Sequence, residues 1–475
     1  MIVLNCSFVL ECFMDTFEQP ASPLYPPHIE PAAGELPIWT LLRLLVANPM
    51  RIVHERVYRE PIVTGHRLGL DIAWITDPAL IMTVLLGEAD TYEKSEFEKR
   101  LLGPNVANGI LSAKGAAWRW QRNIGAPLFR HAQTMANVPQ MSASATACVE
   151  RWRAGNQLPG QRRDVEPDMK DVAFDVVSTT VMAGFNAGET AAIKHTEQIN
   201  ARYMHWDIAA AFLSLPERMW YPYKNTLVSA NAAMRVALMR LIARRRTELA
   251  SQPAEDILGR LIAARHPGTG ETLTDDQVCD NVAAYLDAGH ESSASALTWG
   301  TYLLARSPFW QNRMRAEVAM VAGNGPIEAR HIEQLVVTTR VVKETLRLYP
   351  SFPAMVRVTT QATTLGGKQL AKGTLVFVLI YATHRHTKLW DDPGRFDPDR
   401  FTPEREAAMP RGQYLPFSAG QRICLGMNFA LAGLVTALAT FVRAARFDWD
   451  GQQIEPVSQI NLRPRDGMPL RVTLL

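Results

Sequence analysis

Ten residues near the end of the chain, Phe417 to Gly426, read FSAGQRICLG and contain the cysteine around which the rest of the sequence can be arranged. Their spacing, F-x-x-G-x-R-x-C-x-G, fixes five positions. Ordinary residue frequencies produce this pattern in a chain of this length with a chance on the order of one in ten thousand. The apolar run that follows, Leu425 to Phe441, predicts a buried helix that begins just after Cys424.

Cys424 has the surroundings that a thiolate ligand of haem iron requires. The free N–H groups at the start of the following helix favour an anion. Gly420 and Gly426 remove Cβ atoms where backbone turns tightly or lies against a flat ring. Phe417 can cover the sulfur, and Arg422 can pair with a haem propionate through its forked guanidinium.

The ten residues resemble the cysteine signature of the cytochrome P-450 family of haem-thiolate monooxygenases, and four further segments resemble motifs of that family. These segments are W-x-x-x-R at Trp118 and Arg122, A-G-x-[D/E]-[T/S] from Ala288 to Ser292, E-x-x-R at Glu344 and Arg347, and P-x-x-F-x-P-x-R-F from Pro393 to Phe401. The resemblance covers roughly Leu36 to the C-terminus. It implies a mainly α fold with a small β region, a triangular helical prism with haem b between a long distal helix and the proximal cysteine loop.

The resemblance also implies roles for individual residues. The implied haem contacts are Trp118, Arg122, Ala288, Arg357, Phe417, Arg422, Cys424 and Gly426, with Cys424 as the iron ligand. Glu344, Arg347 and Arg400 would form a structural ion network that fixes the cysteine loop.

Glu291 and Ser292 are the expected catalytic pair, because an acid beside an alcohol can hold a water chain and deliver protons while oxygen is activated. The family usually has Thr where this chain has Ser292, which lacks the methyl group that stiffens χ1. Taken alone, Gly289 and Ser292 would be better explained as small residues that relieve crowding between two packed helices.

The expected substrate pocket is lined by Ala284, Asp287, Ala288, Pro353, Ala354 and Met355. One helical step of about 100° separates Asp287 from Ala288, so its carboxylate can hold a hydroxyl or amine of the substrate. The alternative is that Asp287 turns away and bonds a neighbouring helix or loop. The polar loop Glu93 to Gly115 and the aromatic segment Tyr203 to Tyr223 are weaker pocket candidates, and the latter also suits plain core.

Local patterns predict the remaining elements. Val63 and Leu68 to Ile75 predict short strands around a His-Arg turn, and Asp77-Pro78 predicts the start of a helix. The chain from Thr134 to Ile332 is mainly helical by periodicity. Phe352 to Val358 and Thr374 to Ile380 predict two further strands.

Composition agrees with a globular protein: 47% of the 475 residues are hydrophobic and 20% are charged. A net charge of +3 gives no reason to expect nucleic-acid binding. Five cysteines without clustered spacing favour a reducing, cytoplasmic compartment. The other four cysteines are interpreted as ordinary buried residues: Cys6, Cys12, Cys148 and Cys279.

We expect one catalytic domain over residues 36–475, preceded by a proline-rich lead-in over residues 1–35. Two apolar stretches, Met1 to Met14 and Leu36 to Ala47, are too short to cross a bilayer, so no transmembrane anchor is expected.

The implied reaction uses O2 and inserts one oxygen atom, by hydroxylation or epoxidation, into a small to medium, largely apolar organic substrate. The 51 residues after Cys424 contain no flavin or iron–sulfur signature, so electrons are expected from a separate ferredoxin or flavodoxin with an NAD(P)H reductase. The candidates for a basic docking patch are Lys114, Arg119, Arg130, Arg405 and Arg411. Two alternatives stay open: a peroxide-using haem-thiolate enzyme, either peroxygenase or isomerase, and a non-catalytic haem sensor.

Overall fold

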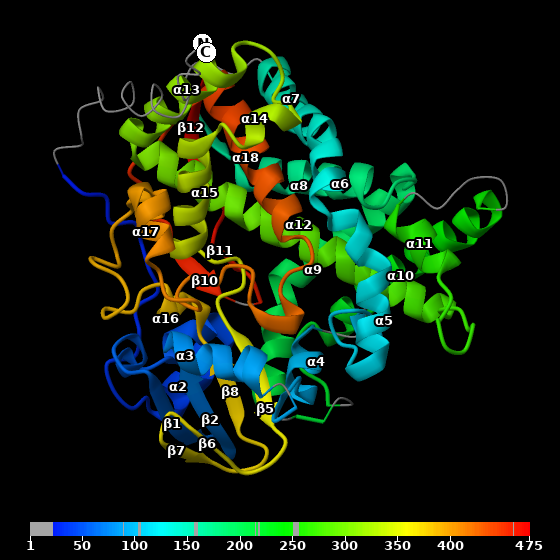
Figure 1. Cartoon of the computed structure of the whole chain (residues 1–475), viewed down its shortest axis with the longest axis vertical. Helices are drawn as coiled ribbons and strands as arrows, with labels where there is room; N and C mark the ends of the chain where they lie inside the picture. The colour runs from blue at the N-terminus through cyan, green and yellow to red at the C-terminus, as the bar shows by residue number, and fades with distance from the viewer. Residues whose placement is uncertain are drawn as a thin grey trace, which may run out of the picture.

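The computed structural model describes residues 22–88, 90–102, 106–155, 160–213, 215–216, 219–249, 256–458 and 460–475. Helices dominate these residues, and the β strands are short (Figure 1). The helices are α2 (Ile38–Ala47), α3 (Pro78–Met82), α4 (Glu96–Leu102), α5 (Gly115–Gly125), α6 (His131–Ala136), α7 (Val138–Ala154), α8 (Glu166–Thr180), α9 (Ala187–Phe212), α10 (Lys224–Glu248), α11 (Ile257–Ala263), α12 (Asp275–Arg306), α13 (Pro308–Ala322), α14 (Ala329–Ile332), α15 (Val336–Leu348), α16 (Ile380–Thr383), α17 (Pro403–Ala407) and α18 (Met427–Ala444). The mainly α fold with a small β region is confirmed.

Helix α12 runs through the middle of the helical part and organises two apolar cores (Figure 1). Its start is fixed by a capping box, in which the Thr274 hydroxyl accepts from the N–H of Gln277 and the Gln277 side chain accepts from the N–H of Thr274. The first half, up to Leu286, packs in one core with α8, α10 and α11. The second half, from Ala296, packs in another with α15 and α18. The segment between them, residues 287–295, carries only small or polar side chains.

The main sheet has five strands in the order β1-β2-β8-β5-β3. The strands are β1 (Ile62–Arg67), β2 (Leu70–Ile75), β3 (Tyr92–Glu93), β5 (Met355–Thr359) and β8 (Leu375–Val378). Strand β2 runs parallel to β8, and the other neighbours are antiparallel. The two strands predicted after residue 350 are therefore present and pair with each other, with Met355 opposite Val378.

The first hairpin corrects one prediction, because its turn does not lie at His66 and Arg67. Both residues belong to β1, and the turn is made by Leu68 and Gly69. Their φ angles are 52° and 77°, and a two-residue hairpin turn with positive φ at both positions matches the right-handed twist of the flanking strands.

Three smaller sheets complete the β structure. Strand β12 (Pro469–Leu474) pairs with β4 (Gln161–Asp164) and β9 (Ala445–Asp448), β10 (Pro456–Ser458) pairs with β11 (Leu462–Pro464), and β6 (Thr363–Leu365) pairs with β7 (Lys368–Leu370).

Helix α18 is the helix predicted after the cysteine, but it begins later than expected. Its first residue is Met427, three positions beyond Cys424, and Gly426 is its N-cap. Its apolar face lies in the core with α7, α12 and α13.

The described part of the lead-in, residues 22–35, contains no helix and is bound to the domain. The Tyr349 hydroxyl donates to the carbonyl of Pro27 over 2.7 Å, and the N–H of Ile29 donates to the Tyr381 hydroxyl over 2.8 Å. Residues 1–21, including Cys6 and Cys12, lie outside the described residues.

Two helices, α10 and α18, are long and apolar enough to cross a membrane by length and composition alone. Within the molecule, 61% of the apolar window of α18 and 39% of that of α10 are buried. A core helix of a globular protein passes the same test, so this is weak evidence for a membrane span.

Candidate active site

The cysteine loop is held in one shape by its own backbone. The N–H of Cys424 donates to the carbonyl of Phe417 over 2.9 Å, and that of Ile423 donates to Gly420 over 3.1 Å. Ser418 and Gly420 have φ angles of 65° and 76°, in the left-handed region. A Cβ at Gly420 would overlap the carbonyl oxygen of Leu85, so both the turn and the close approach require glycine there.

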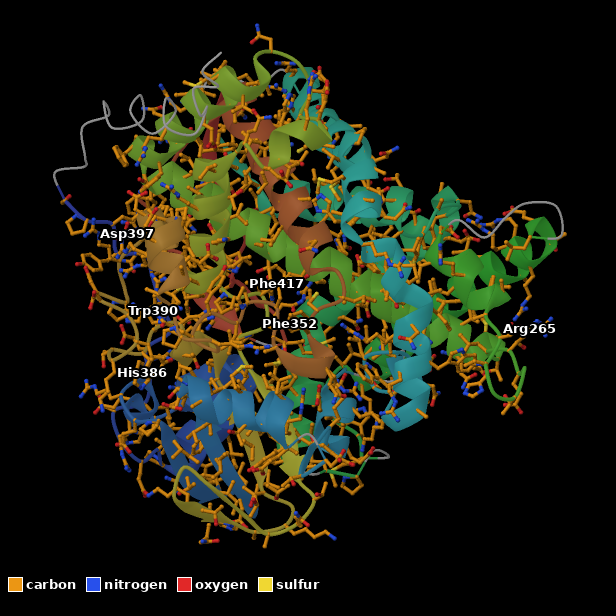
Figure 2. All side chains as sticks on the ribbon, viewed as in Figure 1. Arg265, Phe352, His386, Trp390, Asp397 and Phe417 are labelled. Carbon is orange, nitrogen blue, oxygen red and sulfur yellow. The ribbon has the colours of Figure 1, made fainter. Side chains whose placement is uncertain are left out.

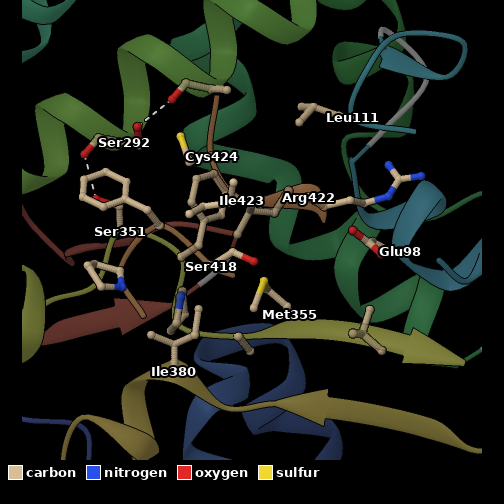
Figure 3. Close-up of a pocket in the computed structure, with 18 of the residues that line it drawn as sticks. Glu98, Leu111, Ser292, Ser351, Met355, Ile380, Ser418, Arg422, Ile423 and Cys424 are labelled. Atoms are coloured by element: carbon tan, nitrogen blue, oxygen red, sulfur yellow. Dashed lines mark hydrogen bonds between the residues drawn. The ribbon is translucent and has the colours of Figure 1, made fainter. Parts of the chain in front are cut away.

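The thiol of Cys424 faces the middle segment of α12 across a cavity (Figure 3). Burial raises the pKa of this thiol, whereas a backbone hydrogen bond from Gly426 and the charge of Arg122 lower it. Coordination by a metal ion would deprotonate it outright.

The cavity has a volume of about 460 Å³ and is lined mainly by apolar side chains. From α12 it receives Ala284, Ala288, Gly289 and Ser292. The opposite wall includes Phe417, Cys424 and Gly426. Figure 2 shows Phe352 and Phe417 near the centre of the molecule, where both line this cavity.

One end of the cavity is strongly cationic. Lys94, Arg122, Arg357 and Arg422 line it, and Glu98 is the single carboxylate among the described lining residues. Burial, with the charge of Arg357 adding to it, lowers the pKa of Arg422 to about 10. Three guanidinium groups and an ammonium group against one carboxylate leave the cavity an excess of positive charge that suits a dianionic ligand.

Trp118 and Arg122 help to fix this cationic end. Arg122 donates to the carbonyl of Ile423 over 3.0 Å and so ties α5 to the cysteine loop. The Arg422 guanidinium lies 4.4 Å from the Trp118 ring and donates to the carbonyl of Ala113 over 2.8 Å. The structure thus brings together residues that the sequence places more than 300 positions apart.

Glu344, Arg347 and Arg400 form the expected ion network, with unequal strength. Arg347 uses all five of its N–H donors, on both oxygens of Glu344 and on three carbonyl groups, over 2.6 to 2.9 Å. The Nε of Arg400 lies 3.6 Å from Glu344 and makes no hydrogen bond. Arg347 therefore carries most of the network.

Sequence reasoning missed His384, which connects this network to the cysteine loop. Its Nε2 accepts from the N–H of Leu415 over 2.8 Å, and its Nδ1 donates to the carbonyl of Arg347 over 3.2 Å. Burial, with Arg347 and Arg385 nearby, lowers the pKa of His384 to about 3, so the imidazole is neutral. No motif marks this residue, because its partners are backbone groups 31 and 37 positions away.

The predicted substrate contact of Asp287 is wrong. Asp287 does not line the cavity, although its neighbours Ala288 and Gly289 do. Its helical position turns it toward Glu197, His290 and Glu291, where burial and the two glutamates raise its pKa to about 8.

Glu291 and Ser292, the predicted acid–alcohol pair, are adjacent on α12, but only one of them lines the cavity. Ser292 lines the cavity and donates to the carbonyl of Ala288 over 2.5 Å, whereas Glu291 is not among the lining residues. The hydroxyl of Ser351 donates to the carbonyl of Ser292 over 2.8 Å, which ties the chain after α15 to α12 (Figure 3). A direct role for Glu291 in proton delivery stays a prediction.

The other pocket residues lie as follows. Ala284, Pro353, Ala354 and Met355 line the cavity. Helix α9 contributes Ile208 and Phe212 to the lining, and this part of the wall is called the cavity roof below.

The weaker pocket candidates are only partly placed at the cavity. Met219 and Trp220, from the aromatic segment, are 44% and 69% exposed and are not among the lining residues. The polar loop contains α4, which was not predicted, and contributes Glu98, Ile110 and Leu111.

A mainly helical fold in which a cysteine loop faces small residues of a long helix is typical of the haem-thiolate class of proteins. The family model for cytochrome P450 matches residues 33–468, and the chain belongs to this family. Its cofactor is haem and it is a monooxygenase. The residues fit the cofactor, because Cys424 would supply the thiolate, Ala288 and Gly289 leave space on the facing wall, and the cationic end suits the two propionates.

The relatives span nearly the whole chain. Cyclooctatin synthase of Streptomyces melanosporofaciens is 30% identical over 465 residues, which cover 96% of each chain. Cyclooctat-9-en-7-ol 5-monooxygenase of the same organism is 30% identical over 380 residues, covering 79% of this chain and 80% of the relative. The crystal structure of the cytochrome P450 CYP102L1 superposes with a TM-score of 0.79 at 22% identity, over 96% of this chain and 100% of that one.

Proposed function

We propose that the enzyme inserts one oxygen atom from O2 into a medium-sized, largely apolar organic molecule with few hydroxyl groups. The cavity is the observation that supports this proposal most directly. The Cys424 thiol faces Ala288, Gly289 and Ser292, and apolar side chains form most of the remaining wall. The relatives named for cyclooctatin and for cyclooctat-9-en-7-ol, an unsaturated alcohol, support this substrate class.

Haem held by Cys424 would supply oxygen activation, which a thiolate ligand favours. The protein supplies position and exclusion of water. Val177, Val181, Ile208, Phe212 and Phe377 offer an apolar surface to the substrate, worth about 25 cal/mol for each Å² removed from water. The Ser292 hydroxyl can leave the Ala288 carbonyl to hold a water molecule or a proton at the cavity wall.

The test combines ligand identity with the source of the oxygen atom. Reduced wild type should give the carbon monoxide difference spectrum of a thiolate-bound haem. Cys424→Ser should lose it, while Cys279→Ser, at a buried cysteine outside the cavity lining, should keep it. With isotope-labelled O2 and a reductase, an apolar carbocyclic substrate should gain one labelled atom.

A wild-type spectrum kept by Cys424→Ser would overturn the assignment of the ligand. Product labelled only when labelled hydrogen peroxide is supplied would show a peroxide-using enzyme instead.

The electron donor we propose is a separate acidic ferredoxin or flavodoxin served by an NAD(P)H reductase, in the cytoplasm. The candidate docking residues Lys114, Arg119, Arg130, Arg405 and Arg411 are all exposed. Lys114 and Arg405 are paired with Glu96 and Asp397, so Arg119, Arg130 and Arg411 carry the proposal. Reduction by such a partner should slow with added salt and in Arg130→Glu. A rate independent of salt would contradict this.

A further inference from the structure

On the side of α12 away from the cavity, three side chains converge from two helices. Glu197 comes from α9, and His290 and Glu291 come from α12. Their potential ligand atoms lie within 4.8 Å of one another. The side chains of His290, Glu197 and Glu291 are 3%, 9% and 23% exposed. None of the three lines the haem cavity, although Glu291 is also the acid of the predicted proton-delivery pair.

In its neutral form, His290 donates a hydrogen bond through Nε2 only, so Nδ1 is free to act as a metal ligand. Its Nε2 lies 3.1 Å from the carbonyl oxygen of Lys170. A carbonyl oxygen can only accept, so Nε2 carries the hydrogen. In the neutral imidazole, Nδ1 then presents a lone pair, and it faces Glu197 Oε1 at 2.9 Å and Glu291 Oε1 at 4.0 Å.

His290 Nδ1 and Glu197 Oε1 lie 2.9 Å apart as a buried ion pair. Burial lowers the pKa of His290, but the charge of Glu197 outweighs this effect and raises the pKa, so a metal ion here would take the place of a ring proton. Both atoms are buried, and neither has a hydrogen-bond partner. A hydrogen bond would place the oxygen near the axis of the ring nitrogen. Two ligands of one tetrahedral zinc ion, each about 2.0 to 2.2 Å from the metal, instead lie about 3.3 to 3.6 Å apart with the metal off the line that joins them. The misalignment fits the second arrangement, and the 2.9 Å separation would open slightly to admit the metal.

The surroundings supply the two other features of a metal site. Histidine ligands of metals commonly donate the second ring N–H to a backbone carbonyl, which is the bond that His290 makes with Lys170. Negative charge is also in excess. Glu197 and Glu291 lie beside Asp287, whose pKa burial and these two carboxylates raise to about 8, while the nearby ammonium of Lys170 is already 2.9 Å from Glu166. A proton on His290 would offset one of these charges, whereas a divalent cation would offset two.

We propose that Glu197, His290 and Glu291 bind a divalent transition metal, with zinc as the best match, and so clamp α9 to α12. One imidazole with two carboxylates suits zinc, whereas magnesium and calcium prefer oxygen alone. Because α9 also carries Ile208 and Phe212 on the cavity roof, the bound metal would hold that roof in place.

The test uses the haem-loaded full chain after treatment with a chelator. Calorimetric titration with zinc should show one site per chain in addition to the haem iron, and magnesium should produce no comparable binding. X-ray absorption at the zinc edge, which haem iron does not disturb, should show nitrogen and oxygen neighbours at about 2.0 to 2.2 Å and no sulfur. No zinc binding above that of magnesium, or a sulfur neighbour, would overturn the proposal.

Variants assign the site to these residues. Glu197→Gln keeps the size of the side chain and removes an anionic ligand, so zinc affinity should fall at least about tenfold, as it should in His290→Gln. The matched control is Asp171→Asn, whose carboxylate pairs with Lys194 over 2.7 Å outside the cluster, and it should bind zinc as wild type does. Equal zinc affinity in Glu197→Gln and wild type would end the proposal. If either variant fails to fold, the zinc-edge spectrum of the wild type decides.

Discussion

On the cysteine side of the cavity, Arg347 satisfies five N–H donors and His384 holds the amide of Leu415 just before the ligand loop. On the α12 side, Ala284, Ala288 and Gly289 present little more than backbone, and the Ser292 hydroxyl is bonded to its own helix. Fixed geometry around an iron ligand requires many satisfied polar groups. Space for oxygen and substrate requires small side chains. The same cavity therefore has one wall held by many hydrogen bonds, the rigid wall, and one wall of small residues, the small-residue wall.

The largest expected effect comes from breaking the rigid wall at Arg347. Arg347→Ala leaves the buried Glu344 carboxylate with only the N–H of Asp397 at 2.8 Å and Arg400 at 3.6 Å, and it frees three carbonyl groups, at a cost of about 3 to 5 kcal/mol in folding free energy. Haem incorporation and urea unfolding should both show the loss. Arg400→Ala should cost less, because its contact with Glu344 is 3.6 Å long.

The control for these variants is Arg405→Ala, an exposed arginine of the same region. It should incorporate haem normally. Normal haem content in Arg347→Ala would show that the network is dispensable.

Acid should weaken the rigid wall through His384. Its pKa is lowered to about 3 in the folded protein, against about 6.5 when unfolded. The unfolded chain therefore binds the proton first, and this stabilisation is complete above about pH 6.5 and is lost progressively as pH falls toward 3. Between pH 7 and pH 5, wild type should lose roughly 2 kcal/mol more unfolding free energy than His384→Gln. Parallel pH profiles of the two proteins would contradict this role.

On the small-residue wall, substitutions should change the yield of product per electron more than they change folding stability. Ser292→Ala removes a hydroxyl from the cavity wall and should keep substrate affinity and haem content. The fraction of reducing equivalents recovered as product should fall several-fold, with hydrogen peroxide released instead. Glu291→Gln, outside the cavity lining, separates the two members of the predicted pair: unchanged coupling in this variant would assign proton delivery to Ser292 without its neighbour.

The smallest effect is expected at Asp287. Because its carboxylate lies outside the cavity lining, Asp287→Asn should leave the affinity for apolar and polar ligands within about twofold, where loss of a charged hydrogen bond would cost about 1.5 to 3 kcal/mol. Ligand titrations followed by the haem spectrum measure this. A selective loss of polar ligands would restore the contact predicted from sequence.

The sequence by itself was enough to predict Cys424 as the iron ligand, the helical class and the membership of the Glu-Arg network. Cys424 and Arg347 sit in local patterns whose spacing reflects geometry within one loop or one helical turn, and local geometry is readable from spacing.

Only the tertiary structure decided which way the side chains of α12 point and what they meet. A helix places Asp287, Ala288 and Glu291 within about one turn, so the spacing alone cannot say which face meets the cavity and which meets α9. His384 and the pairing of Glu197 with His290 depend on segments far apart in the chain. Their partners are set by packing, which no local pattern records.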